Sequence, residues 1–395
     1  MSAGLASGDR ALSAEFLTEV LGDLVRTPSV NPGIFEEAMA ERVQAWLEPT
    51  GAEVTTVEMA PGRPSVAAVL GNRDGATRLV LNGHMDTVPI DDAAGWDFDP
   101  FGAEISDGYL FGRGACDMKA GLATQIGVAH RLAAHADELD GALILHFAAG
   151  EECAEPGSLS LVQAGFTGDV GIVTEPTQLG VAVAERGLAY YRIRIKGRSI
   201  HASKAHLGLN PVRRLAPVLD ALADYHDEIT QRTHPLLPGG SCTPTVVQGG
   251  VKENAVADYC ELLLDRRLLP GETVEGELDA MSARLKGIQR DDPEFQFEIE
   301  PFEHAFAPAE ISVDSPFAGR VVEAVEQITG MRPEISGTPY ASDVRTLVND
   351  AAMEAVTFGP GNVAECHCAN ERVSLAEVEQ AARVIDRVAR SLLLP

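Results

Sequence analysis

The sequence predicts an α/β protein in which a layered domain, with a mixed sheet and helices on both faces, carries an inserted ferredoxin-like α+β domain. Two observations predict this architecture. Short apolar runs alternate with helical stretches from residue 52 to residue 177, which is typical of a layered α/β domain. From residue 187 the order changes to strand, helix, strand, strand, helix, strand, which is the order of a ferredoxin-like sandwich.

Hydrophobic periodicity predicts the elements of the layered domain. Apolar residues recur at helical spacing from Leu12 to Leu24 and predict an amphipathic helix that ends near Pro28. Further helices are predicted from residue 36 to 47 and from residue 118 to 135. The apolar runs SVAAVLG, RLVLNG, ALILHFAAG and DVGIVTE predict strands.

The inserted domain is predicted from residue 187 to residue 301, so the layered domain comprises residues 1–186 and 302–395. A chain of 395 residues is long enough for two such domains. The runs LAYYRIRIKG, TPTVVQGG, DYCELLLDRR and EFQFEIE predict the strands of the insertion. Helices are predicted at residues 210–229, 273–288, 317–328 and 375–393, and a further strand at residues 354–358.

The net charge of −28 argues against two classes of partner. It repels phosphate backbones and anionic lipid headgroups, and no run of Lys and Arg forms a basic patch. We therefore expect no nucleic-acid or membrane partner. A well-hydrated protein surface accounts for this negative charge, and a saline environment favours such a surface.

The opening segment MSAGLASGDRALSAEF lacks the basic flank and apolar core of a secretory signal. No apolar run reaches membrane-spanning length. The six cysteines have no compact framework spacing, which fits thiols that stay reduced. We therefore expect a cytoplasmic protein.

Three predicted strands end in residues that can bind metal. LVLNG leads into His84, ILHFAAG leads into Glu151 and Glu152, and GIVT leads into Glu175. In open α/β sheets, ligand sites lie beyond the carboxyl ends of the strands, so these side chains should converge on one crevice.

A site for two divalent ions needs imidazole and carboxylate ligands and one carboxylate that can bridge the ions. A lone His or Glu is usually solvated or hydrogen-bonded, but the position of several candidates at strand ends favours a metal site. The five candidate ligands are His84, Asp117, Glu152, Glu175 and His367.

Two further acidic residues lie beside these candidates. Asp86 follows His84 by two residues, so in an extended segment it lies on the same side and can accept the second ring N–H of the histidine. Glu151 precedes Glu152 and should point in another direction, so one of the pair can bind metal while the other acts as general base.

Six motifs carry a resemblance that covers nearly the whole chain. In order they are GHMDTVP, GRGACDMKAG, AGEE, TEPT, GRSIHAS and ECHCANE. With this order and spacing, the chain resembles the M20 metallopeptidases and deacylases, the group that includes acetylornithine deacetylase, succinyl-diaminopimelate desuccinylase and glutamate carboxypeptidase.

The resemblance implies a ligand set for two divalent ions: zinc, or alternatively cobalt or manganese. His84 and Glu175 would hold one ion, and Glu152 and His367 would hold the other. Asp117 would bridge them.

Cys366 and Cys368 flank the proposed ligand His367. If residues 366–368 are extended, the two thiols point away from His367, and we expect both cysteines to be small buried packing residues.

The resemblance also implies roles around the substrate. Glu151 would be the general base, and His201 in the inserted domain would reach a neighbouring subunit's site and stabilise the developing oxyanion. A homodimer that forms through the inserted domain is therefore expected. Arg267 would grip the substrate carboxylate. The other residues that resemble substrate contacts are Asn254, Asp343 and Gly361.

A glutamate at position 175 is typical of the deacylases and carboxypeptidases of this family. We therefore predict removal of an acyl group from an N-acyl amino acid, as in acetylornithine deacetylase or succinyl-diaminopimelate desuccinylase. The expected substrate is an N-acyl amino acid or a short peptide. A glutamate carboxypeptidase-type or dipeptide-cleaving metallopeptidase is the alternative. A catalytically silent binding protein with the same fold would have lost a ligand or the base, whereas this chain keeps Glu151 and every candidate ligand. A dinucleotide enzyme is disfavoured because no early strand leads into a glycine fingerprint.

Overall fold

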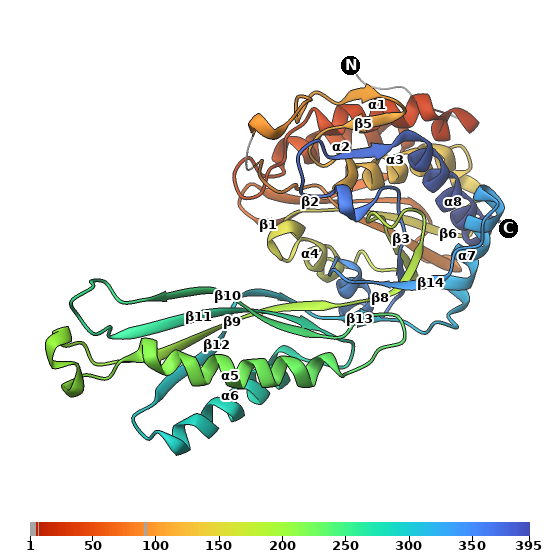
Figure 1. The fold of residues 1–395 in the computed structure, drawn as a ribbon. Coiled ribbons are helices and arrows are strands. Elements are labelled where there is room, and N and C mark those ends of the chain that lie inside the picture. Colours follow the sequence, from red (N-terminus) through yellow and green to blue (C-terminus); the bar gives the residue numbers. More distant parts are fainter. Residues whose placement is uncertain (1–4, 7, 91–92) are drawn as a thin grey trace. The chain divides into compact units, whose positions relative to one another are not determined.

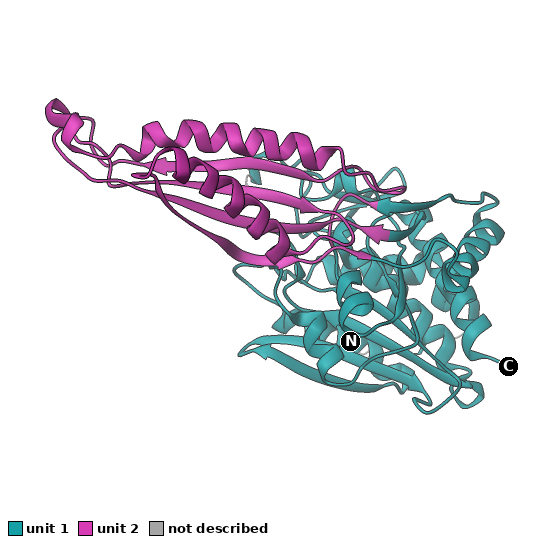
Figure 2. Ribbon diagram, turned by 90° about the horizontal axis from the view of Figure 1, so that it is seen from below, with its two compact units in different colours: residues 1–183, 310–337, 342–395 teal, residues 184–309, 338–341 magenta. Residues whose placement is uncertain are grey.

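The structure is a computed structural model that describes residues 5–6, 8–90 and 93–395 (Figure 1). The chain divides into two compact units, which Figure 2 shows in different colours. Unit 2 contains the insertion predicted at residues 187–301. Unit 1 comprises Met1–Val183, Glu310–Gly337 and Ser342–Pro395, and unit 2 comprises Ala184–Ala309 and Thr338–Ala341.

The large sheet of unit 1 is mixed, as predicted. Its strand order is β1-β2-β6-β3-β7-β15-β8-β13, and β14 pairs with β8. In the series β6-β3-β7-β15, each strand is parallel to the next one. Strand β2 pairs antiparallel with both β1 and β6. The bounds are Glu53–Ala60 (β1), Arg63–Gly71 (β2), Thr77–His84 (β3), Gly141–Ala148 (β6), Val170–Val173 (β7), Val181–Glu185 (β8), Ala309–Glu310 (β13), Ile335–Thr338 (β14) and Glu354–Thr357 (β15).

Helices cover both faces of this sheet. Every residue of β6 is buried, as expected for a strand that helices cover on both sides. Helices α1, α3, α7 and α8 pack against one another, and α4 packs against β1, β2 and β6 from the opposite side (Figure 1). The helices of unit 1 are Ala14–Val25 (α1), Glu37–Leu47 (α2), Ala120–Ala133 (α3), Gly157–Gln163 (α4), Pro316–Thr329 (α7) and Leu375–Leu393 (α8).

The predicted helix at residues 118–135 begins later than expected. Asp117 has φ −121° and ψ 98°, and Met118 has φ −131° and ψ 37°, so neither residue is helical. The prediction was wrong here because apolar spacing does not detect a local distortion of the backbone. A small sheet lies beside this segment and consists of Glu104–Ser106 (β4), Tyr109–Phe111 (β5) and Arg372–Ser374 (β16).

Unit 2 has the predicted ferredoxin-like order. Its antiparallel sheet has the strand order β10-β11-β9-β12. Alternate residues of β9 and β11 are buried, because one face of the sheet packs against the two helices. Tyr191, Leu262 and Tyr225 are among the buried residues of this core. The elements are Gly187–Lys196 (β9), Pro211–Thr230 (α5), Ser241–Gly249 (β10), Tyr259–Leu268 (β11), Val274–Asp291 (α6) and Gln296–Phe306 (β12).

Helix starts follow the capping residues. The side chains of Ser13, Asn210, Thr273, Ser315 and Ser374 accept backbone N–H groups at the starts of α1, α5, α6, α7 and α8. Among the described residues, none of the helices combines the length and apolar composition needed to cross a membrane.

Candidate active site

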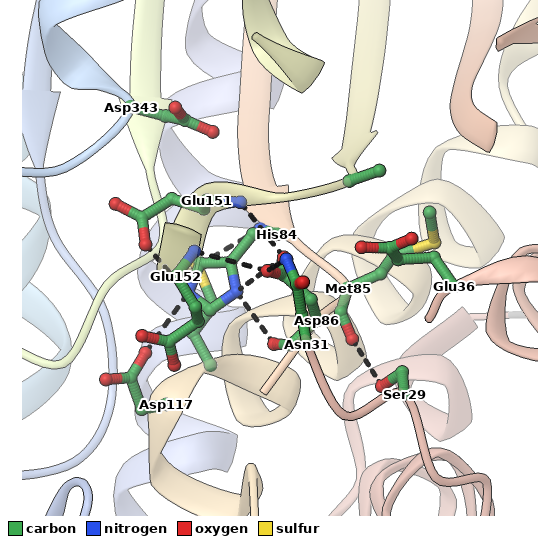
Figure 3. Close-up of polar contacts among 12 residues, drawn as sticks. Ser29, Asn31, Glu36, His84, Met85, Asp86, Asp117, Glu151, Glu152 and Asp343 are labelled. Carbon is green, nitrogen blue, oxygen red and sulfur yellow. Dashed lines mark hydrogen bonds and ion pairs between the residues drawn. The ribbon is translucent and has the colours of Figure 1, made fainter. Parts of the chain in front are cut away.

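The carboxyl ends of three neighbouring parallel strands supply four side chains of the site. His84 is the last residue of β3, Glu151 and Glu152 follow β6, and Glu175 follows β7. Because β6, β3 and β7 are adjacent, their ends meet at one edge of the sheet. Figure 3 shows His84 and the two glutamates directed toward a common centre.

Asp117 lies between two histidines that come from distant parts of the chain. Its Oδ1 is 3.1 Å from Nε2 of His84, and its Oδ2 is 3.2 Å from Nε2 of His367. His84 Nε2 is also 3.5 Å from Oε1 of Glu175, and His367 Nε2 is 3.1 Å from Oε2 of Glu152. The five candidate ligands are therefore brought together, with the two oxygens of Asp117 facing different histidines.

The segment that carries Asp117 is held by contacts that sequence reasoning missed. Glu371 accepts the backbone N–H groups of Cys116 and Asp117 at 2.9 and 3.0 Å. Arg113 donates to the other oxygen of Glu371 at 2.7 Å. Both residues lie within or beside the quoted motifs, Glu371 at the end of ECHCANE and Arg113 in GRGACDMKAG, which was the available signal.

Asp86 differs from the expectation in how it acts. The Nδ1 of His84 lies 2.9 Å from the backbone carbonyl oxygen of Asp86 and 3.6 Å from its carboxylate. The carboxylate instead accepts the backbone N–H groups of Glu151 and Glu152 at 3.1 and 3.2 Å. Asp86 therefore orients the histidine through its main chain and the glutamate loop through its side chain (Figure 3).

The site concentrates buried negative charge. Burial and the neighbouring Asp117 carboxylate together raise the pKa of Glu152 to about 7, although His367 and His84 oppose the shift. Burial also raises the pKa values of Glu151 and Glu175 well above the usual range. Burial opposes ionisation of Asp117 too, but hydrogen bonds from His367 and His84 lower its pKa.

This donor set suits divalent cations. His84, Asp117 and Glu152 each offer one ligand atom, and these atoms lie within 4.8 Å of one another. Imidazole and carboxylate are ligands that zinc and related ions accept, and a positive ion offsets the cost of burying several carboxylates together. The residues present therefore fit a metal centre.

Two predicted substrate residues lie in unit 1. Asp343 is buried, and Ser158 donates a hydrogen bond to it. Gly361 has φ 98°, and a Cβ atom there would lie 2.6 Å from the sulfur of Cys116, so the position requires glycine. Sequence reasoning missed Arg345, whose guanidinium lies 3.6 Å from the carboxylate of Asp343. Burial raises the pKa of Glu151, and the charge of Arg345 lowers it.

The cysteines beside His367 do not meet the expected geometry. His367 has φ 58°, so residues 366–368 are not extended. Cys366 and Cys368 are half-buried rather than buried. Their thiols lie near Cys116 and the backbone of Glu365.

Three predicted residues lie in unit 2. An isolated bridge pairs His201 with Ala255, and the N–H of Ala202 donates to the carbonyl of Asn254 at 2.8 Å, so His201 and Asn254 are neighbours. Arg267 pairs with Asp265 at 2.9 Å and lies opposite Leu188 in the sheet. His201 follows the last residue of β9, whereas Leu188 is near its start, so unit 2 keeps Arg267 apart from His201.

A layered α/β fold with histidines and carboxylates gathered at its strand ends is typical of metal-dependent hydrolases. The family described as Peptidase family M20/M25/M40 matches residues 80–391 of the chain. The chain therefore belongs to this family, as the resemblance implied, and it is a hydrolase that acts on amide bonds.

Curated relatives match over nearly their full lengths. An N-formyl-4-amino-5-aminomethyl-2-methylpyrimidine deformylase from Halalkalibacterium halodurans is 26% identical, over 94% of this chain and 93% of its own. A succinyl-diaminopimelate desuccinylase from Parvibaculum lavamentivorans is 30% identical, over 94% of both chains. An acetylornithine deacetylase from Vibrio atlanticus is 27% identical, over 90% of this chain and 91% of its own.

Solved structures share the fold. The YXEP protein of Bacillus subtilis, described as a dinuclear metal-binding peptidase of the M20 family, superposes with a TM-score of 0.74. The match covers 98% of this chain and 99% of that chain at 19% sequence identity.

Proposed function

We propose that this chain is a two-metal deacylase that removes the acyl group from an N-acyl amino acid, as a succinyl-diaminopimelate desuccinylase or acetylornithine deacetylase does. The observation that carries the proposal is the position of Asp117, whose two carboxylate oxygens face His84 and His367. A carboxylate that faces two separate imidazoles is placed to bridge two ions.

The ligand assignment follows the distances in the site. His84 and Glu175 would hold one ion, His367 and Glu152 the other, and Asp117 both. Zinc is our first choice, with cobalt or manganese as alternatives, because these ligand types serve all three. The bound ions would supply Lewis acidity for the amide carbonyl and lower the pKa of water to about 7.

Glu151 is the proposed general base. It is buried, and its carboxylate lies 4.0 Å from His84 Nε2, at the edge of the ligand cluster rather than within it. Glu151 would take the proton from the attacking water and pass it to the leaving amine. Burial raises the pKa of Glu151, which makes it a stronger proton acceptor than an exposed carboxylate.

Arginines are the proposed contacts for the carboxylates of the substrate. Arg267 remains our candidate for the amino acid carboxylate. Arg345 is an additional candidate, because it lies beside Asp343 and its charge acts on Glu151. A planar guanidinium can hold a carboxylate through two hydrogen bonds.

We propose that the protein is a homodimer formed through unit 2. Arg267 and His201 lie toward opposite ends of a sheet about 10 residues long, a separation of about 30 Å at roughly 3.3 Å per residue. One copy of unit 2 cannot bring both side chains to one small substrate, so His201 and its neighbour Asn254 would serve the site of the partner. The edge strand β10 exposes Val246 and Val247, which supports its pairing with a second copy.

A hydrolysis screen after defined metal loading tests the proposal. N-succinyl-diaminopimelate and N-acetylornithine should be cleaved faster than acyl-glutamates or dipeptides. Preferred cleavage of acyl-glutamates or dipeptides would favour the carboxypeptidase or dipeptidase alternative. Metal binding without hydrolysis of any of these amides would favour the silent binding protein.

We further propose a cytoplasmic location, since all six cysteines are free thiols.

A further inference from the structure

The loop that carries Glu151 and Glu152 is short and closed at its base. The N–H of Glu155 donates to the carbonyl of Gly150, and the N–H of Ala154 donates to the carbonyl of Glu151, both at 2.8 Å. Gly150 has φ 80°. Because the loop is closed, the points at which its two ends are anchored decide where the base and the ligand lie.

Asp86 anchors the start of the loop. It is fully buried and accepts the N–H groups of Glu151 and Glu152. The oxygen that accepts the N–H of Glu152 also accepts a hydrogen bond from the side-chain amide of Asn31 at 2.9 Å (Figure 3). The same amide nitrogen lies 3.2 Å from Oε2 of Glu155, so Asn31 connects the two ends of the loop.

Arg63 anchors the end of the loop. Its Nη2 and Nη1 donate to the carboxylate of Glu155 at 2.6 and 3.1 Å. Its Nε and Nη2 donate to the carboxylate of Glu36 at 2.6 and 2.7 Å. Arg63 is 8% exposed and Glu36 is fully buried, so the second carboxylate fixes the guanidinium from behind.

Only an arginine can make this set of contacts. The guanidinium presents its donors in one plane, so one side chain can face two carboxylates at once, whereas a lysine ammonium is a single point charge. The ring of Phe35 lies 4.3 Å below the guanidinium and limits its position further. A Cβ atom on Gly150 would lie 2.7 Å from the Glu155 side chain, so the loop and the ion pair are in direct contact.

We propose that Arg63 is a positioning residue that, through Glu155, fixes the loop carrying the general base and one metal ligand. The assignment of those two roles rests on the proposed function. The anchoring of the loop does not, because it follows from the contacts of Arg63, Glu155, Asn31 and Asp86. Loss of the Arg63–Glu155 pair should therefore loosen the loop without unfolding the unit.

The two carboxylates of Arg63 separate positioning from stability. Glu36 is fully buried and lies outside the loop, although it shares Nη2 of Arg63 with Glu155, whereas the side chain of Glu155 is 26% exposed and belongs to the loop. We expect E36Q to lower the thermal midpoint more than E155Q. We expect E155Q to disturb the loop more than E36Q does, and R63K to affect both the loop and the thermal midpoint.

The test measures amide hydrogen exchange of the Gly150–Glu155 loop by mass spectrometry in metal-free protein, together with the thermal midpoint. E155Q should raise exchange of the loop by about tenfold or more, as expected for the loss of a charged hydrogen bond. E36Q should raise exchange of the loop less than E155Q does, because the Arg63–Glu155 pair remains. R78Q is the matched control, since it removes an arginine pair with Asp169 at a side chain that is 37% exposed.

Loop exchange that stays at the wild-type rate in E155Q would overturn the positioning role. The role would also be overturned if loop exchange simply followed the loss of thermal stability, so that E36Q showed the largest increase. Zinc titration against a chelator is the second readout. Wild type should bind two ions, and E155Q should weaken binding by about 10- to 100-fold, as with other residues that orient a ligand. If wild type binds no zinc while loop exchange responds as expected, the proposed function fails and the positioning role of Arg63 is supported.

Discussion

Each unit buries a cluster of carboxylates, but arginines neutralise only the Glu277 cluster of unit 2, whereas the Asp117 cluster of unit 1 faces histidines. In unit 2, Glu277 accepts hydrogen bonds from Arg232 at 2.9 Å and Arg266 at 3.0 Å. Burial opposes ionisation of Glu277, yet Tyr225 and the arginines lower its pKa. In unit 1, burial raises the pKa of Glu152 to about 7.

The difference separates a structural cluster from a binding cluster. A buried carboxylate that has a guanidinium partner is satisfied within the protein. The carboxylates of the proposed metal site in unit 1 face histidines and one another, so their charge is incompletely compensated. The protein therefore leaves room for external cations in unit 1 and not in the Arg266 cluster of unit 2.

Removing the proposed base should give the largest effect on activity. We expect E151Q to lower kcat by about 10²- to 10⁴-fold, the usual contribution of a general acid–base. Glu151 is not among the proposed ligands, so zinc stoichiometry should stay at the wild-type value. Steady-state kinetics and metal analysis of the same sample check both points. Wild-type turnover in E151Q would remove Glu151 from the mechanism.

Breaking the compensated cluster of unit 2 should act on stability. R266M removes the more buried of the two arginines that face Glu272 and Glu277, and removal of one partner of a buried pair costs about 3–5 kcal/mol. Urea denaturation should report this loss, while zinc stoichiometry stays unchanged. A loss below about 1 kcal/mol would mean that Arg232 alone can neutralise the cluster.

The uncompensated cluster should make the stability of metal-free protein depend on pH. The folded-state pKa of Glu152 is raised from 4.5 to about 7, so the folded state binds more protons than the unfolded state between these values. The contribution of Glu152 to stability is therefore present below pH 4.5 and is lost as the pH rises through 7. Denaturation of chelated protein at several pH values measures this loss, and zinc should reverse it. A metal-free protein that gains stability from pH 5 to 7.5 would contradict the prediction, and E152Q is the matched control.

The smallest effect is expected at an exposed ion pair. Arg78 and Asp169 have side chains that are 37% and 47% exposed, and such pairs contribute about 0–1 kcal/mol. R78Q should therefore change neither turnover nor metal content, and should shift the urea midpoint only slightly. A loss of stability as large as that of R266M would show that the exposure of an ion pair does not decide how much the pair contributes to stability.

Sequence patterns were sufficient for residues whose role follows from their position on a strand. His84, Glu151, Glu152 and Glu175 could be grouped because parallel strands end at one edge. Asp117 and His367 were also candidate ligands, but neither ends a strand of the large sheet, and only the family resemblance gave them particular roles.

Contacts between distant segments could not be predicted from one sequence. Glu371 holds the N–H of Asp117 from 254 residues away, and Arg63 reaches Glu155 across 92 residues. The non-helical backbone at Met118 was missed for a related reason. Its conformation is decided by what surrounds the segment, whereas periodicity reports only local preference.

Strand β15 lies between β7 and β8 in the middle of the large sheet, although it is formed from residues that follow the inserted unit. During synthesis, a chain that has not yet reached Glu354 therefore has a gap at the centre of its main sheet, and it also lacks His367. We expect nascent or truncated forms to be inactive, and such forms would depend on chaperones to keep that open sheet from pairing with other chains.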